Sequence, residues 1–302
     1  MKIRLILNGA KGERSDVQEA IDWVRRYHFF ALDVRYTQEP EDFERLIHDA
    51  VRDGIDRVIA GGGDGTLNLI VNALMKLPAK QRPEMAILPI GTANDFATAA
   101  FIPENPRQAL IAAIDGFASN VDIGEVSERY FLNVASGGFG AVVTAETPPE
   151  LKEILGGGAY ALTGLLKLFD FQPIYGSMKI GEFCFEGSAF AIAVCNGRQA
   201  GGGMVLAPEA KVDDGLFDIV LYTLDNLPIP ATLAPPSSIL GWLLPFKKIL
   251  RASEVEFIPE EGPRQINLDG EPYSADSFRF TLHPGALSMV LPPDTPLLGG
   301  NR

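Results

Sequence analysis

The sequence predicts a protein of class α/β + β, in which an N-terminal doubly wound α/β nucleotide-binding domain is followed by a C-terminal β-sandwich domain. The first 124 residues alternate strand-like and helix-like apolar patterns, which is typical of a parallel sheet with helices on both faces. A glycine-rich stretch in that region, residues 60–68, lies where a strand turns into a helix. Residues 125–290 instead show short, regularly spaced strand patterns with Gly and Pro turns, which favours a sandwich.

The periodicity of apolar residues defines the elements of the first domain, 1–124. Strands are expected at 3–7, 32–36, 57–60 and 85–90. Helices are expected from residue 15, from 40 to 54, from 67 and from 105 to 116.

The second domain, 125–290, is expected to contain strands at 130–135, 188–195, 217–222, 255–258, 265–268 and 278–283. A hairpin should turn at Gly181-Glu182. The proline-rich tail, 291–302, is expected to be poorly ordered unless it packs back onto the first domain.

Composition and charge exclude several classes of protein. The 302 residues are 46% apolar and carry a net charge of −13, which argues against a general nucleic-acid binder, because such proteins need a basic face. The two cysteines form no disulfide framework, and the three histidines show no metal-ligand spacing. Because there is no signal-peptide pattern and no run of about 18 apolar residues, the cytoplasm is the expected location.

The glycine-rich loop has the chemistry of a phosphate site. Glycines let a ligand approach the backbone, and the start of the following helix offers free N–H groups to an anion. The spelling Gly-Gly-Gly-Asp-Gly-Thr is neither G-x-G-x-x-G nor a Walker A loop. A carboxylate beside a phosphate requires a cation between them, so Asp64 suggests Mg²⁺. Asn8, Thr37 and Thr92 follow other strands, and parallel topology should bring all four stretches to one edge.

Three further motifs each leave two interpretations open. Asp213-Asp214-Gly215 is either an ordinary turn, which the residues alone favour, or a cation site. Asp269 and Glu271 either flank a hairpin turn or supply a general base for phosphoryl transfer. The apolar segments 151–171 and 237–250 are either helices packed on the sandwich or contacts with a membrane surface.

Three stretches together, residues 61–68, 88–97 and 269–271, resemble the diacylglycerol kinase catalytic family, which includes sphingosine, ceramide and bacterial lipid kinases. Residues 133–140, 196–203 and 214–216 are similar to its bacterial YegS-like branch. The resemblance covers nearly the whole chain. The glycine motif by itself is shared with NAD kinases and 6-phosphofructo-type kinases, but its combination with Gly-Thr-Ala-Asn-Asp-Phe is specific.

The resemblance implies roles for individual residues. Glu271 would accept the proton of the acceptor hydroxyl, and Asp64 would act through Mg²⁺. Asp214 would hold a second, structural Mg²⁺ together with the backbone carbonyls of Lys211 and Leu216. ATP would be bound by Thr37, Gly63, Asp64, Gly65, Thr66, Leu67, Asn68, Leu69 and Thr92. The chain departs from the family at Leu69, where Glu is common.

The leading hypothesis is an ATP-dependent lipid kinase that phosphorylates a hydroxyl of a diacylglycerol-, sphingoid- or phosphatidylglycerol-like lipid. Its lipid partner would be met peripherally at a membrane surface, and no nucleic acid is expected as a partner. One alternative is a soluble-substrate kinase similar to NAD kinase. Another is a nucleotide or lipid sensor without catalysis, which Leu69 favours.

Overall fold

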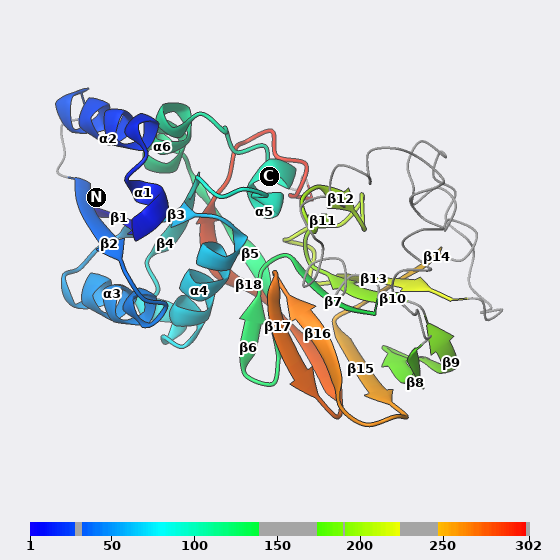
Figure 1. Cartoon of the computed structure of the whole chain (residues 1–302). Helices are drawn as coiled ribbons and strands as arrows, with labels where there is room; N and C mark the ends of the chain where they lie inside the picture. Colours follow the sequence, from blue (N-terminus) through cyan, green and yellow to red (C-terminus); the bar gives the residue numbers. More distant parts are fainter. Residues whose placement is uncertain (28–31, 139–173, 190, 224–246, 300–302) are drawn as a thin grey trace. The chain divides into compact units, whose positions relative to one another are not determined.

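Figure 1 shows the computed structural model of the chain, which describes residues 1–27, 32–138, 174–189, 191–223 and 247–299. The chain divides into two compact units. Unit 1 consists of Met1–Asn133, Asn196–Gly215 and Leu282–Arg302, and unit 2 consists of Val134–Cys195 and Leu216–Thr281.

Unit 1 is built on a parallel sheet in the order β2-β1-β3-β4-β18 (Figure 1). Strand β5 pairs with β18 and, antiparallel, with β6. The strands are β1 (Ile3–Asn8), β2 (Leu32–Thr37), β3 (Arg57–Gly62), β4 (Glu84–Pro89), β5 (Ala118–Val126), β6 (Arg129–Phe131), the small hairpin β11 (Gln199–Ala200) and β12 (Met204–Val205), and the end of β18 (Phe278–Val290). The helices are α1 (Gly9–Gly12), α2 (Ser15–Tyr27), α3 (Glu41–Arg52), α4 (Asp64–Met75), the 3-10 turn η1 (Ala79–Gln81), α5 (Asp95–Ala99) and α6 (Pro106–Asp115).

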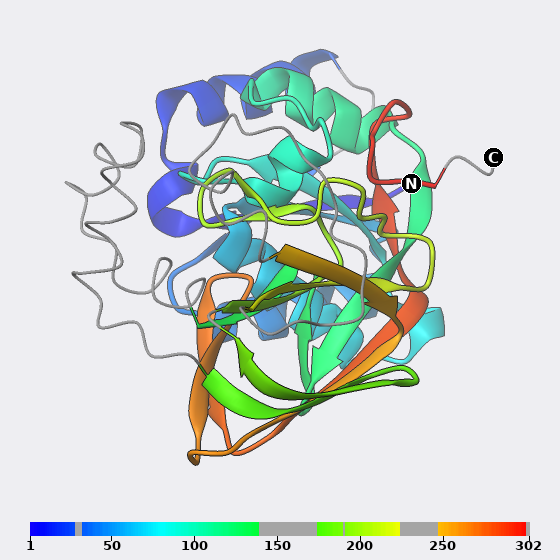
Figure 2. The same cartoon turned by 90° about the vertical axis from the view of Figure 1, so that its right-hand side faces the viewer.

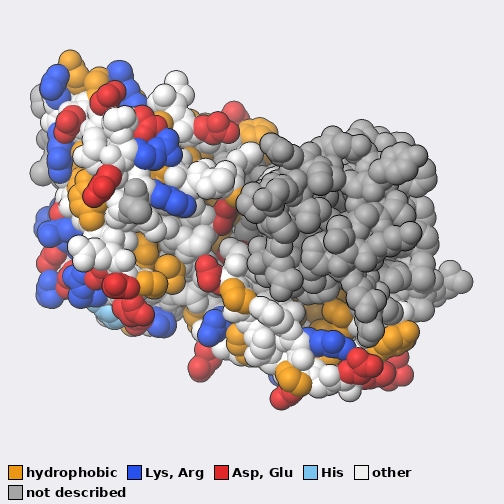
Figure 3. Space-filling model, viewed as in Figure 1, with side chains coloured by type: hydrophobic (Ala, Val, Ile, Leu, Met, Phe, Trp, Pro, Cys, Tyr) orange, Lys and Arg blue, Asp and Glu red, His pale blue; other side chains and the backbone are white. Residues whose placement is uncertain are grey.

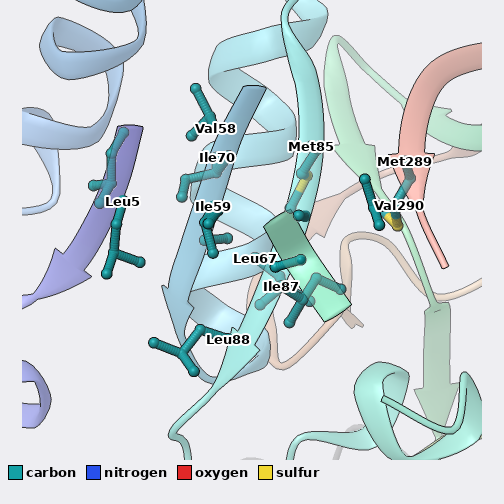
Figure 4. Packing of buried hydrophobic residues seen from close by; sticks show 14 of the residues in the cluster. Leu5, Val58, Ile59, Leu67, Ile70, Met85, Ile87, Leu88, Met289 and Val290 are labelled. Atoms are coloured by element: carbon teal, nitrogen blue, oxygen red, sulfur yellow. The ribbon is translucent and has the colours of Figure 1, made fainter. Parts of the chain in front are cut away.

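Helices cover both faces of this sheet. Helix α2 packs with α6 and α3 packs with α4, and the two pairs lie on opposite sides of β1, β3 and β4 (Figure 1 and Figure 2). Apolar side chains of the strands and of α4 fill the space between them, as Figure 4 shows for Ile59, Ile87 and Ile70. Apart from the ion pair between Arg57 and Glu84 at their starts, strands β3 and β4 are apolar and buried on both faces, as expected in a parallel sheet.

Unit 2 contains two antiparallel sheets. One has the order β14-β13-β10-β7-β16-β17, and the other joins the start of β18 to β15, β8 and β9. Side chains of both sheets, including Ile192 and Phe257, line a cavity of about 20 Å³, which is the size of one water molecule. The strands are β7 (Val134–Gly138), β8 (Ile174–Ile180), β9 (Phe183–Ala189), β10 (Ala191–Cys195), β13 (Phe217–Tyr222), β14 (Lys247–Ala252), β15 (Glu254–Pro259), β16 (Arg264–Leu268) and β17 (Glu271–Ala275).

The predicted fold class is confirmed, and the hairpin at Gly181-Glu182 is present, since Ile180 pairs with Phe183. Other elements differ from the expectation. The single strand expected at 130–135 is divided between β6 and β7. Of the expected apolar helix at 237–250, the described residues 247–250 are strand, paired with β13. The rest of it and the segment 151–171 lie outside the described residues.

The compact units differ from a division at residue 124. Strand β5 continues to Val126, and the segment 196–215 belongs to unit 1 and not to the second domain. Backbone hydrogen bonds explain this placement, because the Asn196 N–H donates to the Asn133 carbonyl at 2.9 Å. The tail residues after 291 belong to unit 1 as well, and the Val212 N–H donates to the Leu297 carbonyl at 2.9 Å.

The visible charges of unit 1 are mixed. In Figure 3, Lys and Arg side chains alternate with Asp and Glu over this face, without a continuous basic stripe. Among the described residues, no helix is long and apolar enough to cross a membrane.

Candidate active site

The ends of the parallel strands in unit 1 bring four separate segments to one edge. Asn8 and Thr37 are register partners at the ends of β1 and β2, and Gly62 and Pro89 are partners at the ends of β3 and β4. The first two ends approach closely, because a Cβ on Gly9 would lie 2.4 Å from the Thr37 carbonyl oxygen. The convergence that the sequence predicts is therefore present in the structure.

The glycine loop ends at Gly63, the N-cap residue of α4. Gly63 provides no side-chain cap, so the first N–H groups of this 12-residue helix remain available at the edge. A Cβ on Gly91 would lie only 2.4 Å from the Gly63 Cα atom. The two Gly turns, residues 61–63 and 91–94, thus touch through their backbones. They form one surface, which a ligand can approach closely.

Asp64 connects the two turns. Its carboxylate accepts hydrogen bonds from the backbone N–H groups of Asp95 at 3.1 Å and Phe96 at 3.3 Å. Asn94 holds the second turn in shape: it adopts a left-handed conformation with φ 53°, and its amide bonds both the N–H and the carbonyl of Gly91. Asp64 therefore has a positioning contact that its sequence context did not reveal, and each oxygen keeps a further lone pair for a cation.

Asp95 is a buried carboxylate that residue-by-residue reasoning missed. It accepts hydrogen bonds from the N–H groups of Gly202 at 2.8 Å and Gly203 at 2.6 Å. Burial raises the pKa of Asp95 above its ordinary value, and the nearby Asp64 carboxylate raises it further against these two hydrogen bonds. The motif Asn-Asp-Phe could have marked Asp95 as a functional residue. Only the tertiary structure shows that its partner is the second glycine cluster, residues 196–203.

A cavity of about 540 Å³ opens next to the glycine-rich loop. Two of the predicted ATP residues, Thr37 and Leu69, line it, together with apolar Phe43. Its full lining is Asn8, Gly9, Glu13, Tyr36, Thr37, Gln38, Glu39, Pro40, Phe43 and Leu69. The cavity has the size of a small-molecule site and mixes apolar walls with a few polar groups.

Two of the predicted nucleotide residues do not present side chains at this edge. Leu67 is 4% exposed and belongs to the hydrophobic core, and its N–H donates to the Gly63 carbonyl. Asn68 donates its side-chain amide to the Tyr130 carbonyl at 3.0 Å. Helical periodicity turns both side chains inward, because they lie on the face of α4 that packs on the sheet. Thr92, by contrast, is exposed at the edge.

The turn predicted as a metal site is fixed by hydrogen bonds within unit 1. The Lys211 ammonium donates to the Pro296 and Leu298 carbonyls at 2.7 and 3.2 Å. The buried Asp122 carboxylate accepts the Gly215 N–H at 2.7 Å, and burial, reinforced by Asp214 and Asp213, raises the pKa of Asp122. Among the described residues, no group of three or more His, Cys, Asp or Glu side chains has the geometry of a metal site.

Glu271 lies in unit 2 at the start of β17, directly after a tight turn. Asp269 and Gly270 in this turn have φ values of 51° and 102°, as a two-residue hairpin requires. The Asp269 carboxylate accepts the Val134 N–H at 2.9 Å, so it serves to anchor the turn on β7. The Glu271 carboxylate is exposed and makes no hydrogen bond or ion pair with the described residues, so of the two carboxylates it is the one available to a substrate.

The structure therefore groups the predicted residues by unit. Thr37, the loop 63–69 and Thr92 come together at one edge of unit 1, and Lys211 and Asp214 lie in a separate turn of the same unit. Leu216 and Glu271 belong to unit 2.

Comparisons with known proteins identify two domains that follow one another along the chain. Residues 2–126 match the model of the diacylglycerol kinase catalytic domain, and residues 133–291 match the YegS C-terminal NAD kinase beta sandwich-like domain. A protein of Shewanella frigidimarina named "Probable lipid kinase YegS-like" is 44% identical over 98% of this chain and 96% of its own. A protein of the same name from Chromohalobacter salexigens is 43% identical over 97% of this chain and 94% of its own.

A solved structure shares the fold. The crystal structure of a diacylglycerol kinase from Bacillus anthracis str. Sterne superposes with a TM-score of 0.73 at 23% identity, and the match covers 97% of each chain.

Proposed function

This chain belongs to the diacylglycerol kinase catalytic-domain family, in its YegS-like branch, and we propose from this premise that it is an ATP-dependent lipid kinase. It would transfer the γ-phosphoryl group to a hydroxyl of a membrane lipid. The observation that carries the proposal is the joined pair of Gly turns in unit 1, where Gly63 and Gly91 pack backbone against backbone beside an uncapped helix start. This arrangement suits a polyphosphate, because N–H groups and the helix dipole favour negative charge.

The residues at this edge would suit a nucleotide. The first turn of α4 would bind phosphate oxygens, and the cavity at Thr37 and Leu69 would hold the nucleoside. The Leu69 side chain gives that cavity an apolar wall at the position where the family resemblance leads one to expect Glu. Binding of ATP therefore depends here on backbone N–H groups and apolar contact.

Mg²⁺, bound near Asp64 with the nucleotide, would neutralise charge on the transferred group. Asp64 would do so while its hydrogen bonds with α5 keep the two turns together. Asp214, with the carbonyls of Lys211 and Leu216, would hold a second, structural Mg²⁺. The donor set of one carboxylate and two carbonyls is chemically suited to a hard cation that keeps several waters.

Glu271 would accept the proton of the lipid hydroxyl. Its exposed carboxylate follows the Asp-Gly turn and is engaged with no described residue, so it is free to act as a general base. The protein would meet the lipid peripherally from the cytoplasm.

The deciding experiment is transfer of label from γ-labelled ATP to a total bacterial lipid extract, with Mg²⁺ or with EDTA, followed by thin-layer chromatography. We expect a labelled lipid only in the presence of the metal. The variant Glu271→Gln should lower kcat by at least about 100-fold, since general bases contribute that much or more. Glu256→Gln, an exposed change of the same charge in unit 2, should leave the rate unchanged.

The molecule that becomes labelled distinguishes a lipid kinase from a kinase that acts on a soluble substrate. Labelling of NAD in place of every lipid would replace the proposal by an NAD kinase-like activity. ATP binding with no labelled product of either kind would indicate a sensor, and Leu69→Glu would then be tested for restored transfer.

A further inference from the structure

Lys11 is a cation placed at the glycine loop that no motif marks. It lies in the short helix α1, immediately after β1, and its ammonium nitrogen is 3.6 Å from the position that a Cβ on Gly63 would occupy. The Gly91 Cα and the Asn94 side-chain oxygen lie within 3.8 Å of the same point. The ammonium therefore lies beside the two Gly turns, next to the position that a side chain at residue 63 would occupy.

The Lys11 ammonium has no partner among the described residues: it makes no hydrogen bond or ion pair with them. Neighbouring cations differ in this respect. Arg14 is occupied by Asp16 at 2.6 Å and by the Ile90 carbonyl, and Lys76 at the far end of α4 is paired with Glu44 at 2.7 Å. Of these three cations, only Lys11 is free to bind a ligand.

The negative charge around the loop explains why a lysine here would favour phosphate binding. The protein carries a net charge of −13, and two carboxylates, Asp64 and Asp95, lie at or beside the loop. A nucleotide phosphate that approaches them meets repulsion, which the partial charges of one helix start offset only in part. A full positive charge at Gly63 offsets it directly, and charge-assisted hydrogen bonds to phosphate are among the stronger contacts available.

We infer that Lys11 binds a phosphate oxygen of the nucleotide and is a further binding residue of the kinase reaction. The inference rests on the proposed function, since it concerns the same nucleotide. It adds a side-chain cation to a site whose other expected phosphate contacts are backbone N–H groups. A side chain at position 63 would crowd this arrangement, because its Cβ would lie 3.1 Å from the Gly91 Cα and 3.6 Å from the ammonium.

The test is isothermal titration calorimetry of the full chain with ATP, ADP, AMP and adenosine, in EDTA and in Mg²⁺. Lys11→Met should weaken ATP binding at least about tenfold and leave adenosine binding within about twofold, since a hydrogen bond to a charged group is worth about one to two decades. Lys11→Arg should retain most of the affinity, because it keeps the charge. Lys76→Met is the matched control at the opposite end of α4 and should bind ATP like the unsubstituted protein.

Several outcomes would overturn the inference. They are unchanged ATP binding by Lys11→Met, an equal loss for ATP and adenosine, and an equal loss in Lys76→Met. The thermal unfolding midpoint of Lys11→Met should match that of the unsubstituted protein, since the ammonium has no partner among the described residues, and a large fall would indicate a structural role instead.

The proposed function fails separately. If the unsubstituted protein binds ATP but labels no lipid, the lipid-kinase proposal is lost, whereas the comparison of Lys11 variants still reports on phosphate binding. If the unsubstituted protein binds none of the four ligands, both are lost.

Discussion

The carboxylate of Asp95 accepts a hydrogen bond of 2.6 Å from the backbone N–H of Gly203, across 108 residues of sequence. The neighbouring Gly202 N–H donates to the same carboxylate at 2.8 Å. Both glycines have positive φ values, 82° and 105°, and their Cβ positions have no neighbour within 4 Å. The buried Asp95 side chain thus ties the second glycine cluster, residues 196–203, to helix α5.

Replacing Asp95 by Ala should release this cluster. Two charge-assisted hydrogen bonds would be lost, so the Gly202 and Gly203 amides should exchange their hydrogens at least about tenfold faster, because each such bond contributes about 1.5–3 kcal/mol. Hydrogen exchange followed by mass spectrometry of a peptide over 199–205 measures this. Thr98→Ala, an exposed change on the same helix, should leave exchange unchanged, and equal exchange in Asp95→Ala would show that other contacts hold the cluster.

Asp95 should also give stability a characteristic pH dependence. Because burial raises its pKa in the folded state above the ordinary 3.8, the folded protein holds this proton more tightly than the unfolded chain does. The stabilisation from this group is complete below about pH 3.8 and is lost as the pH rises through the raised folded pKa. Asp95→Asn cannot titrate. The unfolding free energy of the unsubstituted protein minus that of Asp95→Asn, from urea titrations, should therefore fall with rising pH and then level off, and a flat difference would contradict the assignment.

Gly91 should be intolerant of Ala. The new Cβ would lie 2.4 Å from the Gly63 Cα and 2.5 Å from the Asn94 amide oxygen, so the two Gly turns must separate. We expect ATP affinity to fall by at least about tenfold, with a loss of stability of about 1–3 kcal/mol from overpacking. Calorimetry with ATP and urea unfolding measure the two effects. Ala93→Ser, an exposed change in the same turn, is the control, and native ATP affinity in Gly91→Ala would show that the turns need not touch.

Arg4 should contribute strongly to the stability of unit 1. Its guanidinium, 2% exposed, donates to Asp33 and Asp53 at 2.7 Å each and to the Leu46 carbonyl. Arg4→Met would remove these contacts while Asp33 keeps its ion pair with Arg35, and it should destabilise the protein by about 3 kcal/mol, a value at the low end for buried pairs because both carboxylates are partly exposed. Arg45→Met breaks a solvent-exposed pair with Asp42 and should destabilise the protein much less than Arg4→Met does. Equal midpoints in urea for the two variants would refute this ranking.

Much of the fold could be read from local patterns. The four N-terminal strands and the helices between them followed from apolar periodicity, because each buries one face or both against a neighbour. The hairpin at Gly181-Glu182 followed from its turn residues, since Gly181 adopts φ 55°. The predictions of local structure that failed were those that depended on a tertiary partner. Residues 247–250 end a segment whose apolar spacing suggested a helix, but they pair with β13, and no local pattern reports such a partner.

The sequence by itself determined which kinds of residue meet at the edge of the parallel sheet, because parallel strands all present their carboxyl ends there. It also determined the family, through the combination and order of its motifs along the chain. Only the tertiary structure decided which side chains act at that edge. Leu67 and Asn68 turn inward with the helix. Lys11, which no motif marks, is brought to the loop at Gly63, 52 residues away, and Asp95 binds Gly202, 107 residues away. Such contacts depend on how elements pack and not on spacing along the chain, and this is the physical reason that the motifs alone could not specify them.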